Sequence, residues 1–221
     1  MKFIKVNPYK LYSFLAGIIL LSATCKKTIQ EEIVIYKNDM EKADLTAISG
    51  GKTTTFQNTK VLGRYNKSGF RLNLNDLPSH NMVQVSFDLY IHDSWDGNKG
   101  NDDGPDLWQM TIDGQGVINT TFSNRPCAAY WDCDLQSYPG EYPQSSLPRA
   151  SETRVNLPGA CVLASEKGSS LYRIVKLIRH SGTSLTLEYM DQLKQTNAQA
   201  SAQECDESWS MDNIEIKAIK Y

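Results

Sequence analysis

The stretch that decides the fold is MVQVSFDLYI, residues 82–91. Its apolar side chains stand at every second position from Val83 to Ile91. Successive side chains of a β-strand point to opposite faces of the sheet, so this alternation predicts a strand with one buried face. Similar strands are expected at residues 70–74, 171–179, 185–189 and 214–217.

Short turn sequences separate these segments. Asp113-Gly114 lies between residues 107–112 and 116–122, and Ser181-Gly182-Thr183 lies between 171–179 and 185–189. Such turns between two strand-like runs predict hairpins. No long segment shows the 3.6-residue apolar period of a helix. The sequence therefore predicts an all-β protein with a single, jelly-roll-like β-sandwich.

The first 25 residues have the pattern of an export signal. Lys2, Lys5 and Lys10 give a positive start, and residues 11–23 are almost wholly apolar. A helix of this length would measure about 20 Å, which is shorter than the roughly 30 Å core of a bilayer. A charged start, a short apolar run and small residues are typical of a secretory signal peptide.

The sequence LSATC, residues 21–25, resembles the processing box of bacterial lipoproteins. The resemblance implies that Cys25 is acylated and anchors the protein to a membrane, periplasmic or at the cell surface. Thr24 departs from the usual Gly or Ala, and cleavage by ordinary signal peptidase is the alternative. Polar residues 26–32 are then expected to form a tether, and residues 33–221 the sandwich domain.

Composition limits the classes of function. Removing 25 of 221 residues leaves 196, enough for one domain with a real core. Three of the 23 basic residues lie in the signal, so the remainder carries 20 basic and 25 acidic residues, a net charge of −5. Nucleic-acid binders carry a basic patch, which this chain lacks. We expect no nucleic-acid partner.

Four cysteines follow the signal, and an even number in an exported protein predicts two disulfides. Three pairings are possible. The closeness in sequence of Cys127 and Cys133 favours their pairing, which leaves Cys161 with Cys205. A zinc site is the alternative, although the cysteines lack CxxC spacing and the three histidines are scattered.

The two ends of the domain carry short motifs, Asn-Asp-Met-Glu at residues 38–41 and Ser-Met-Asp-Asn-Ile-Glu-Ile at 210–216. They resemble the opening and closing strands of jelly-roll carbohydrate-binding modules, with Met40 where Phe is usual. The resemblance implies that the terminal strands lie side by side and that Glu41 and Asp212 hold a structural calcium ion. The alternative is that both are ordinary surface residues at strand ends.

A second acidic cluster occupies residues 92–106. It opens like an EF-hand loop, but no Glu closes it at the twelfth position, so it is not an EF-hand. An irregular calcium loop and a solvated acidic turn are both consistent with the sequence. Its candidate ligands are Asp93, Asp96, Asn98, Asp102, Asp103 and Asp106.

Aromatic residues in the polar loops are candidate ligand contacts, because exposed rings stack on sugars or anchor protein partners. Plugs for the ends of the sandwich are the alternative. Trp108 and Trp209 lie in or beside strands and are expected in the core. The candidate contacts are Trp95, Tyr130, Trp131, Tyr138 and Tyr142.

No catalytic motif is present, neither a Gly-x-Ser-x-Gly elbow nor a His-Glu-x-x-His or phosphate loop. The sequence therefore favours an exported, lipid-anchored binding module, with carbohydrate as the first expected ligand. A protein–protein or adhesion module is the alternative. A glycan-processing enzyme is the third reading, with carboxylates drawn from Asp106, Asp132 or Asp134.

Overall fold

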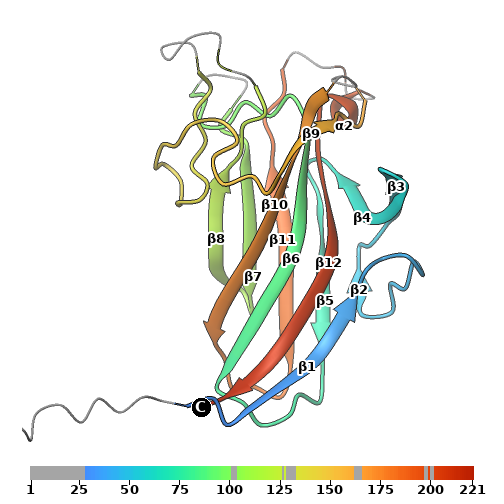
Figure 1. The fold of residues 1–221 in the computed structure, drawn as a ribbon, viewed down its shortest axis with the longest axis vertical. Coiled ribbons are helices and arrows are strands. Elements are labelled where there is room, and N and C mark those ends of the chain that lie inside the picture. Colours follow the sequence, from blue (N-terminus) through green and yellow to red (C-terminus); the bar gives the residue numbers. More distant parts are fainter. Residues whose placement is uncertain are drawn as a thin grey trace, which may run out of the picture.

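Two antiparallel sheets face each other in the computed structural model, which describes residues 28–100, 104–125, 127, 133–161, 166–196, 199 and 202–221 (Figure 1). The first sheet has the order β3 (Thr53–Phe56), β4 (Thr59–Tyr65), β12 (Glu207–Lys220), β6 (Met82–Asp93), β10 (Glu166–Arg179) and β9 (Arg154–Pro158), and β1 (Glu31–Asn38) also pairs with β12.

The second sheet has the order β2 (Ile48–Ser49), β5 (Gly69–Leu74), β11 (Leu185–Gln192), β7 (Leu107–Ile112) and β8 (Gln115–Thr121). One short helix, α2 (Gln203–Asp206), precedes β12. Among the described residues, no helix is long and apolar enough to cross a membrane. The predicted all-β sandwich is confirmed.

The core lies between the sheets, and β6 contributes to it as its alternation predicts. Its apolar positions from Val83 to Ile91 are all buried on the inner face. Trp108 and Trp209 lie there too, with ring centroids 5.8 Å apart. The indole N–H of Trp209 donates to a carboxylate oxygen of Asp191 at 2.7 Å, so this polar atom is paired where water is excluded.

One of the two predicted hairpins forms. Asp113 and Gly114 adopt positive φ values, 48° and 79°, in the turn that joins β7 to β8. The hairpin predicted at Ser181-Gly182-Thr183 is wrong, because β10 pairs in the first sheet and β11 in the second. Alternation predicts that a strand has one buried face. It does not predict which of the two sheets the strand joins.

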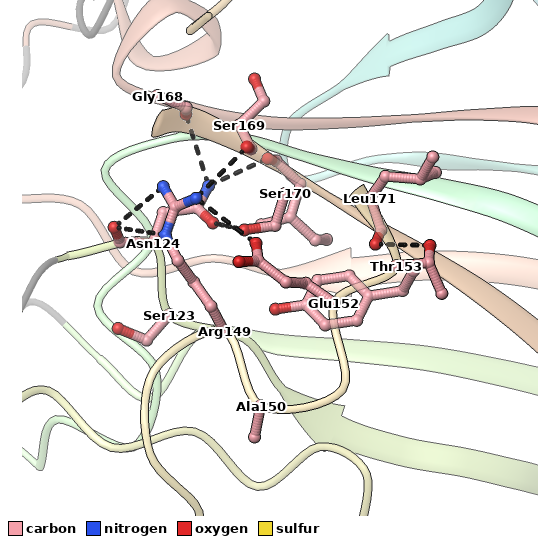
Figure 2. Close-up of polar contacts among 12 residues, drawn as sticks. Ser123, Asn124, Arg149, Ala150, Glu152, Thr153, Gly168, Ser169, Ser170 and Leu171 are labelled. Atoms are coloured by element: carbon pink, nitrogen blue, oxygen red, sulfur yellow. Dashed lines mark hydrogen bonds and ion pairs between the residues drawn. The ribbon is translucent and has the colours of Figure 1, made fainter. Parts of the chain in front are cut away.

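The long connection between β8 and β9 is fastened to β10 by Arg149 (Figure 2). The Arg149 guanidinium donates from Nε and Nη2 to the carbonyl of Asn124, at 3.3 and 3.2 Å, and from Nη1 to the carbonyl of Ser169 at 3.4 Å. Its Nη1 also lies 3.4 Å from a carboxylate oxygen of Glu152. The Arg149 side chain thus binds three segments of the chain, at Asn124, Glu152 and Ser169, and holds this connection against the sheet.

Candidate functional site

A change of strand partners shapes the outer face of the first sheet. β12 pairs with β4 along Trp209–Met211 and with β1 from Ile214 onward. At the change-over, the register with β6 jumps from Asp212 opposite Asp88 to Glu215 opposite Ser86. Asn213 takes a φ of 52° in this bulge. A bulge redirects side chains, and here it brings both Asp212 and Asn213 to the outer face.

Asp88 is the centre of a hydrogen-bonded group on that face. Arg173 donates to its two carboxylate oxygens, from Nε at 2.9 Å and Nη2 at 3.1 Å. Asn213 Nδ2 donates to the same carboxylate at 3.0 Å. Asp88 is buried while the Arg173 side chain is 66% exposed. A two-point guanidinium–carboxylate pair fixes both groups in orientation.

Two depressions meet at these three residues, Asp88, Arg173 and Asn213. One, of about 390 Å³, extends toward Lys37 and Glu215. The other, of about 400 Å³, extends toward β4 and β9 and is also lined by Thr59, Tyr90, Arg154 and Leu171. A third, of about 250 Å³, shares Gln57 with the second and continues to Arg64 and Pro158. We call these three depressions together the outer groove.

Only some of the charged side chains in the outer groove have a partner of opposite charge. The Arg173 guanidinium neutralises Asp88, whereas Asp212 has no cationic partner within the described part of the chain. Burial, followed by the charges of Asp88, Glu41 and Asp39, raises the pKa of Asp212 to about 6. Arg154 is exposed, and among the described residues its side chain makes no hydrogen bond or ion pair.

The expected calcium ligands Glu41 and Asp212 lie on neighbouring segments. The Glu41 carboxylate accepts the backbone N–H of Lys60 at 3.1 Å, and the Lys60 ammonium donates to the Glu41 carbonyl at 3.1 Å. Within the described ranges, no three acidic, His or Cys side chains gather as a metal site would require. Calcium at this position stays a prediction.

The acidic stretch after β6 has side chains that turn to different partners. Asp93 accepts the N–H of Cys161, and Asp96 pairs with the Lys99 ammonium at 3.2 Å. Asp106 accepts backbone N–H groups of Asp96 and Lys194, and burial raises its pKa to about 8.

Of the three remaining candidate ligands in this stretch, the structure describes one. Asn98 donates to the carbonyl of Gln144 at 2.8 Å and accepts from Ser137. Asp102 and Asp103 lie outside the described residues. Where described, the stretch is organised by hydrogen bonds within the protein.

The candidate aromatic contacts that the structure describes are not gathered on one open face. Trp95 is fully buried and donates its indole N–H to the carbonyl of Ser208 at 2.9 Å, so its ring is unavailable for stacking on a ligand. Tyr138 packs against Phe122, with centroids 5.0 Å apart, whereas Tyr142 is 36% exposed. Tyr130 and Trp131 lie outside the described residues, as do Asp132 and Cys25.

Both expected disulfides form. Cys127 is bonded to Cys133, and Cys161 is bonded to Cys205. Asp134, named above as a candidate catalytic carboxylate, forms an ion pair with Arg125, with the charged atoms 2.9 Å apart. Two disulfides in one domain are typical of exported proteins.

Asp212 is the one predicted site residue among the described residues that line the outer groove, and the other lining residues were not predicted. Asp88 and Tyr90 occupy the polar-side positions of the strand that decided the fold, and Arg173 stands in the middle of another predicted strand. A charged residue inside a strand-like run is the one signal the sequence offered. Only the observed register, with Arg173 opposite Asp88, brings them together.

Comparisons with known proteins were made by sequence and by structure. No protein-family model matches the chain, and no curated protein matches it. A family 35 carbohydrate-binding module from Clostridium thermocellum is 7% identical, with a TM-score of 0.37 over 85% of this chain and 97% of that one.

Two further solved structures show likenesses of the same order. A carbohydrate-binding module from Cellvibrio mixtus lichenase 5A, in complex with cellotriose, is 13% identical, with a TM-score of 0.32 over 83% of this chain and 97% of that one. Dimeric latent PorU from Porphyromonas gingivalis is 9% identical, with a TM-score of 0.37 over 86% of this chain and 12% of that one. Carbohydrate-binding modules are thus among the solved structures that this sandwich resembles.

Proposed function

We propose that this domain is a binding module that holds a carbohydrate chain in the outer groove. The observation that carries the proposal is the series of three depressions that share lining residues, with fixed polar groups where the first two meet. A linear oligosaccharide is a ligand of matching shape. Because Asp88 and Arg173 are held by each other and by Asn213, little side-chain entropy is lost when a ligand binds.

The chemistry of the groove also suits a sugar. Sugar hydroxyls both donate and accept hydrogen bonds, and the groove offers acceptors on Asp212 together with donors on Arg173 and Arg154. Tyr90 and Leu171 supply an apolar patch between these polar groups, against which the C–H face of a sugar ring packs. A small polar site with a limited apolar floor favours a hydroxylated ligand over a lipid or an aromatic cofactor.

Substitution of Arg154 and Arg173 tests the groove. A charge-assisted hydrogen bond contributes about 1.5 to 3 kcal/mol, so Arg173→Ala should weaken binding by about tenfold or more. Arg154→Ala should weaken it as well, and it leaves no buried carboxylate behind because Arg154 is exposed and unpaired among the described residues. The measurement is calorimetric titration with the strongest ligand found on an array of bacterial and plant oligosaccharides.

A matched control lies on the other sheet. Arg71 pairs with Glu188 at 2.8 Å and is 60% exposed, much like Arg173 with Asp88. Arg71→Ala should leave the affinity within about twofold. Equal losses for Arg71→Ala and Arg154→Ala, or an array on which nothing binds, would remove the outer groove as a sugar site.

A protein partner is the second candidate function. Val175 and Leu177 are 56% and 50% exposed on the outer face of β10, beyond the groove. Large apolar side chains exposed together favour a protein–protein contact. An array without binding, together with a cellular partner that is lost on Leu177→Lys, would favour this function.

The membrane anchor is a separate proposal. The sequence at residues 21–25 supports acylation of Cys25, and two or more acyl chains on one residue give stable attachment. An acyl mass on the peptide that begins at Cys25 would confirm it.

A calcium ion held by Glu41 and Asp212 is a further proposal, and substitution of Asp212 tests it. Its carboxyl has a raised pKa in the folded protein, so this group favours folding below its unfolded value of about 3.8 and loses that contribution as the pH rises through about 6. In chelator at pH 7, Asp212→Asn should therefore stabilise the fold by about 1 kcal/mol after allowance for solvent screening. The melting temperature would rise by roughly 2 to 4 °C.

Bound calcium would make wild type more stable than Asp212→Asn. If wild type binds the ion, added calcium at 100 times its dissociation constant raises wild-type stability by about 2.7 kcal/mol, while Asp212→Asn gains little. Asp96→Ala should respond to calcium as wild type does, because Asp96 turns to Lys99. Wild-type melting that ignores both chelator and calcium would refute the ion.

A further inference from the structure

Two histidines and an aspartate meet at the end of the sandwich opposite the long β8–β9 connection (Figure 1). His80 lies between β5 and β6, Asp113 in the β7–β8 turn, and His180 just after β10. The two rings are nearly parallel and meet edge to edge, with centroids 5.0 Å apart, planes 13° apart and the facing nitrogens 2.7 Å apart. His80 is 7% exposed, and the His180 side chain is 8% exposed.

The three residues form one chain of polar contacts that begins at Pro78. His80 Nδ1 lies 2.6 Å from the Pro78 carbonyl, and His80 Nε2 lies 2.7 Å from His180 Nδ1. His180 Nε2 lies 3.1 Å from a carboxylate oxygen of Asp113. The other oxygen of Asp113 accepts the N–H of Thr186 at 2.9 Å, which fixes the carboxylate.

Counting protons along this chain gives a definite result. The Pro78 carbonyl can only accept, so His80 Nδ1 must carry a proton. The contact with the Asp113 carboxylate needs a second proton, and the contact between the rings needs a third. Two neutral imidazoles carry two, which leaves one contact without a hydrogen. Two fully protonated rings carry four, and two N–H groups would then oppose each other across 2.7 Å.

We propose that His80, His180 and Asp113 hold three protons together, one more than two neutral imidazoles and a carboxylate, and so form a proton-dependent clasp across three connections of the fold. The added positive charge on the two buried rings is offset by the carboxylate of Asp113, whose side chain is 45% exposed, so the group as a whole is neutral. Asp76, Arg179 and Lys220 are the other charged residues on the adjoining segments. Among the described residues, none of these three bonds to either ring.

The clasp gives stability a definite dependence on pH. In the unfolded chain both histidines titrate near pH 6.5, so above this pH the unfolded state holds fewer protons than the clasp, and below it more. Folding thus takes up a proton above about pH 6.5 and releases one below it. The contribution of the clasp to the folding constant is largest near that pH and falls by up to tenfold per pH unit on either side.

Nitrogen NMR of ¹⁵N-histidine-labelled protein tests the proton count directly. The chain has three histidines, and the third, His92, is an internal standard for a neutral ring because burial lowers its pKa to about 3. At pH 7.5 we expect three ring protons on the His80–His180 pair and one on His92. Two neutral rings in the pair at that pH, each with one proton and with spectra like that of His92, would overturn the proposal.

Urea unfolding between pH 5 and 9 tests the linkage. The difference in unfolding constant between wild type and the double variant His80→Gln/His180→Gln should peak near pH 6.5 and shrink on both sides, because the double variant lacks both titrating histidines of the clasp. Parallel profiles for the two proteins contradict the clasp. If the double variant does not fold, the proton count in wild type decides.

Discussion

Trp209→Ala should destabilise the domain by about 3 to 5 kcal/mol, the cost of removing a buried tryptophan from a packed core. Trp209 is fully buried, and its ring lies 4.8 Å from Tyr65 and 5.8 Å from Trp108 between centroids. The substitution also takes the indole donor away from Asp191, a buried carboxylate at 2.7 Å. For a domain of this size the melting temperature should fall by roughly 6 to 20 °C.

Two further variants separate the contributions of packing and hydrogen bonding at this position. Trp209→Phe keeps most of the apolar volume and removes only the donor to Asp191, so it should cost about 1 to 3 kcal/mol. Val175→Ala, on the outer face where Val175 is 56% exposed, should change stability by less than about 0.5 kcal/mol. Chemical denaturation measures all three, and a Trp209→Ala loss no larger than that of Val175→Ala would contradict the packing described here.

The fold could be predicted from the sequence where one strand face is buried, because burial leaves a period of two in the apolar residues. The β6 strand and the core positions of Trp108 and Trp209 were of this kind, whereas the Asp113-Gly114 turn was predicted from its turn residues. The strand at residues 171–179 was also predicted correctly. The sheet that it joins was not predicted. A hairpin and a crossing from one sheet to the other differ in the partners of both strands, which the sequence of one strand does not show.

The candidate site was predicted less well, for a physical reason. The outer groove is made by register: Arg173 lies opposite Asp88, and the bulge brings Asn213 to the same carboxylate. None of these pairings is local in the sequence. The acidic residues that did stand out as a local cluster, such as Asp93 and Asp106, have carboxylates that accept backbone N–H groups of the protein. A run of like charges therefore marked a folded loop, whereas the central residues of the groove, Asp88, Arg173 and Asn213, were dispersed over three strands.

Replacing both Cys161 and Cys205 by serine should lower stability by about 4 kcal/mol on the chain-entropy argument, because their disulfide closes a loop across a sequence separation of 44 residues. The bridge ties the segment after β9 to α2, directly before β12. It therefore restrains the unfolded chain over nearly the whole of β10 and β11. The same argument assigns about 2 kcal/mol to Cys127–Cys133, whose separation is 6 residues.

The comparison between the two double variants is sharper than either value alone. Both remove one disulfide and add two serine hydroxyls, so the difference of about 2 kcal/mol isolates the length of the closed loop. Urea unfolding of the two variants, with non-reducing peptide mapping of wild type, measures it. Equal losses would show that local contacts at each bridge outweigh chain entropy. A smaller loss for the Cys161–Cys205 pair would mean that the unfolded chain already keeps β9 and α2 close together without the bond.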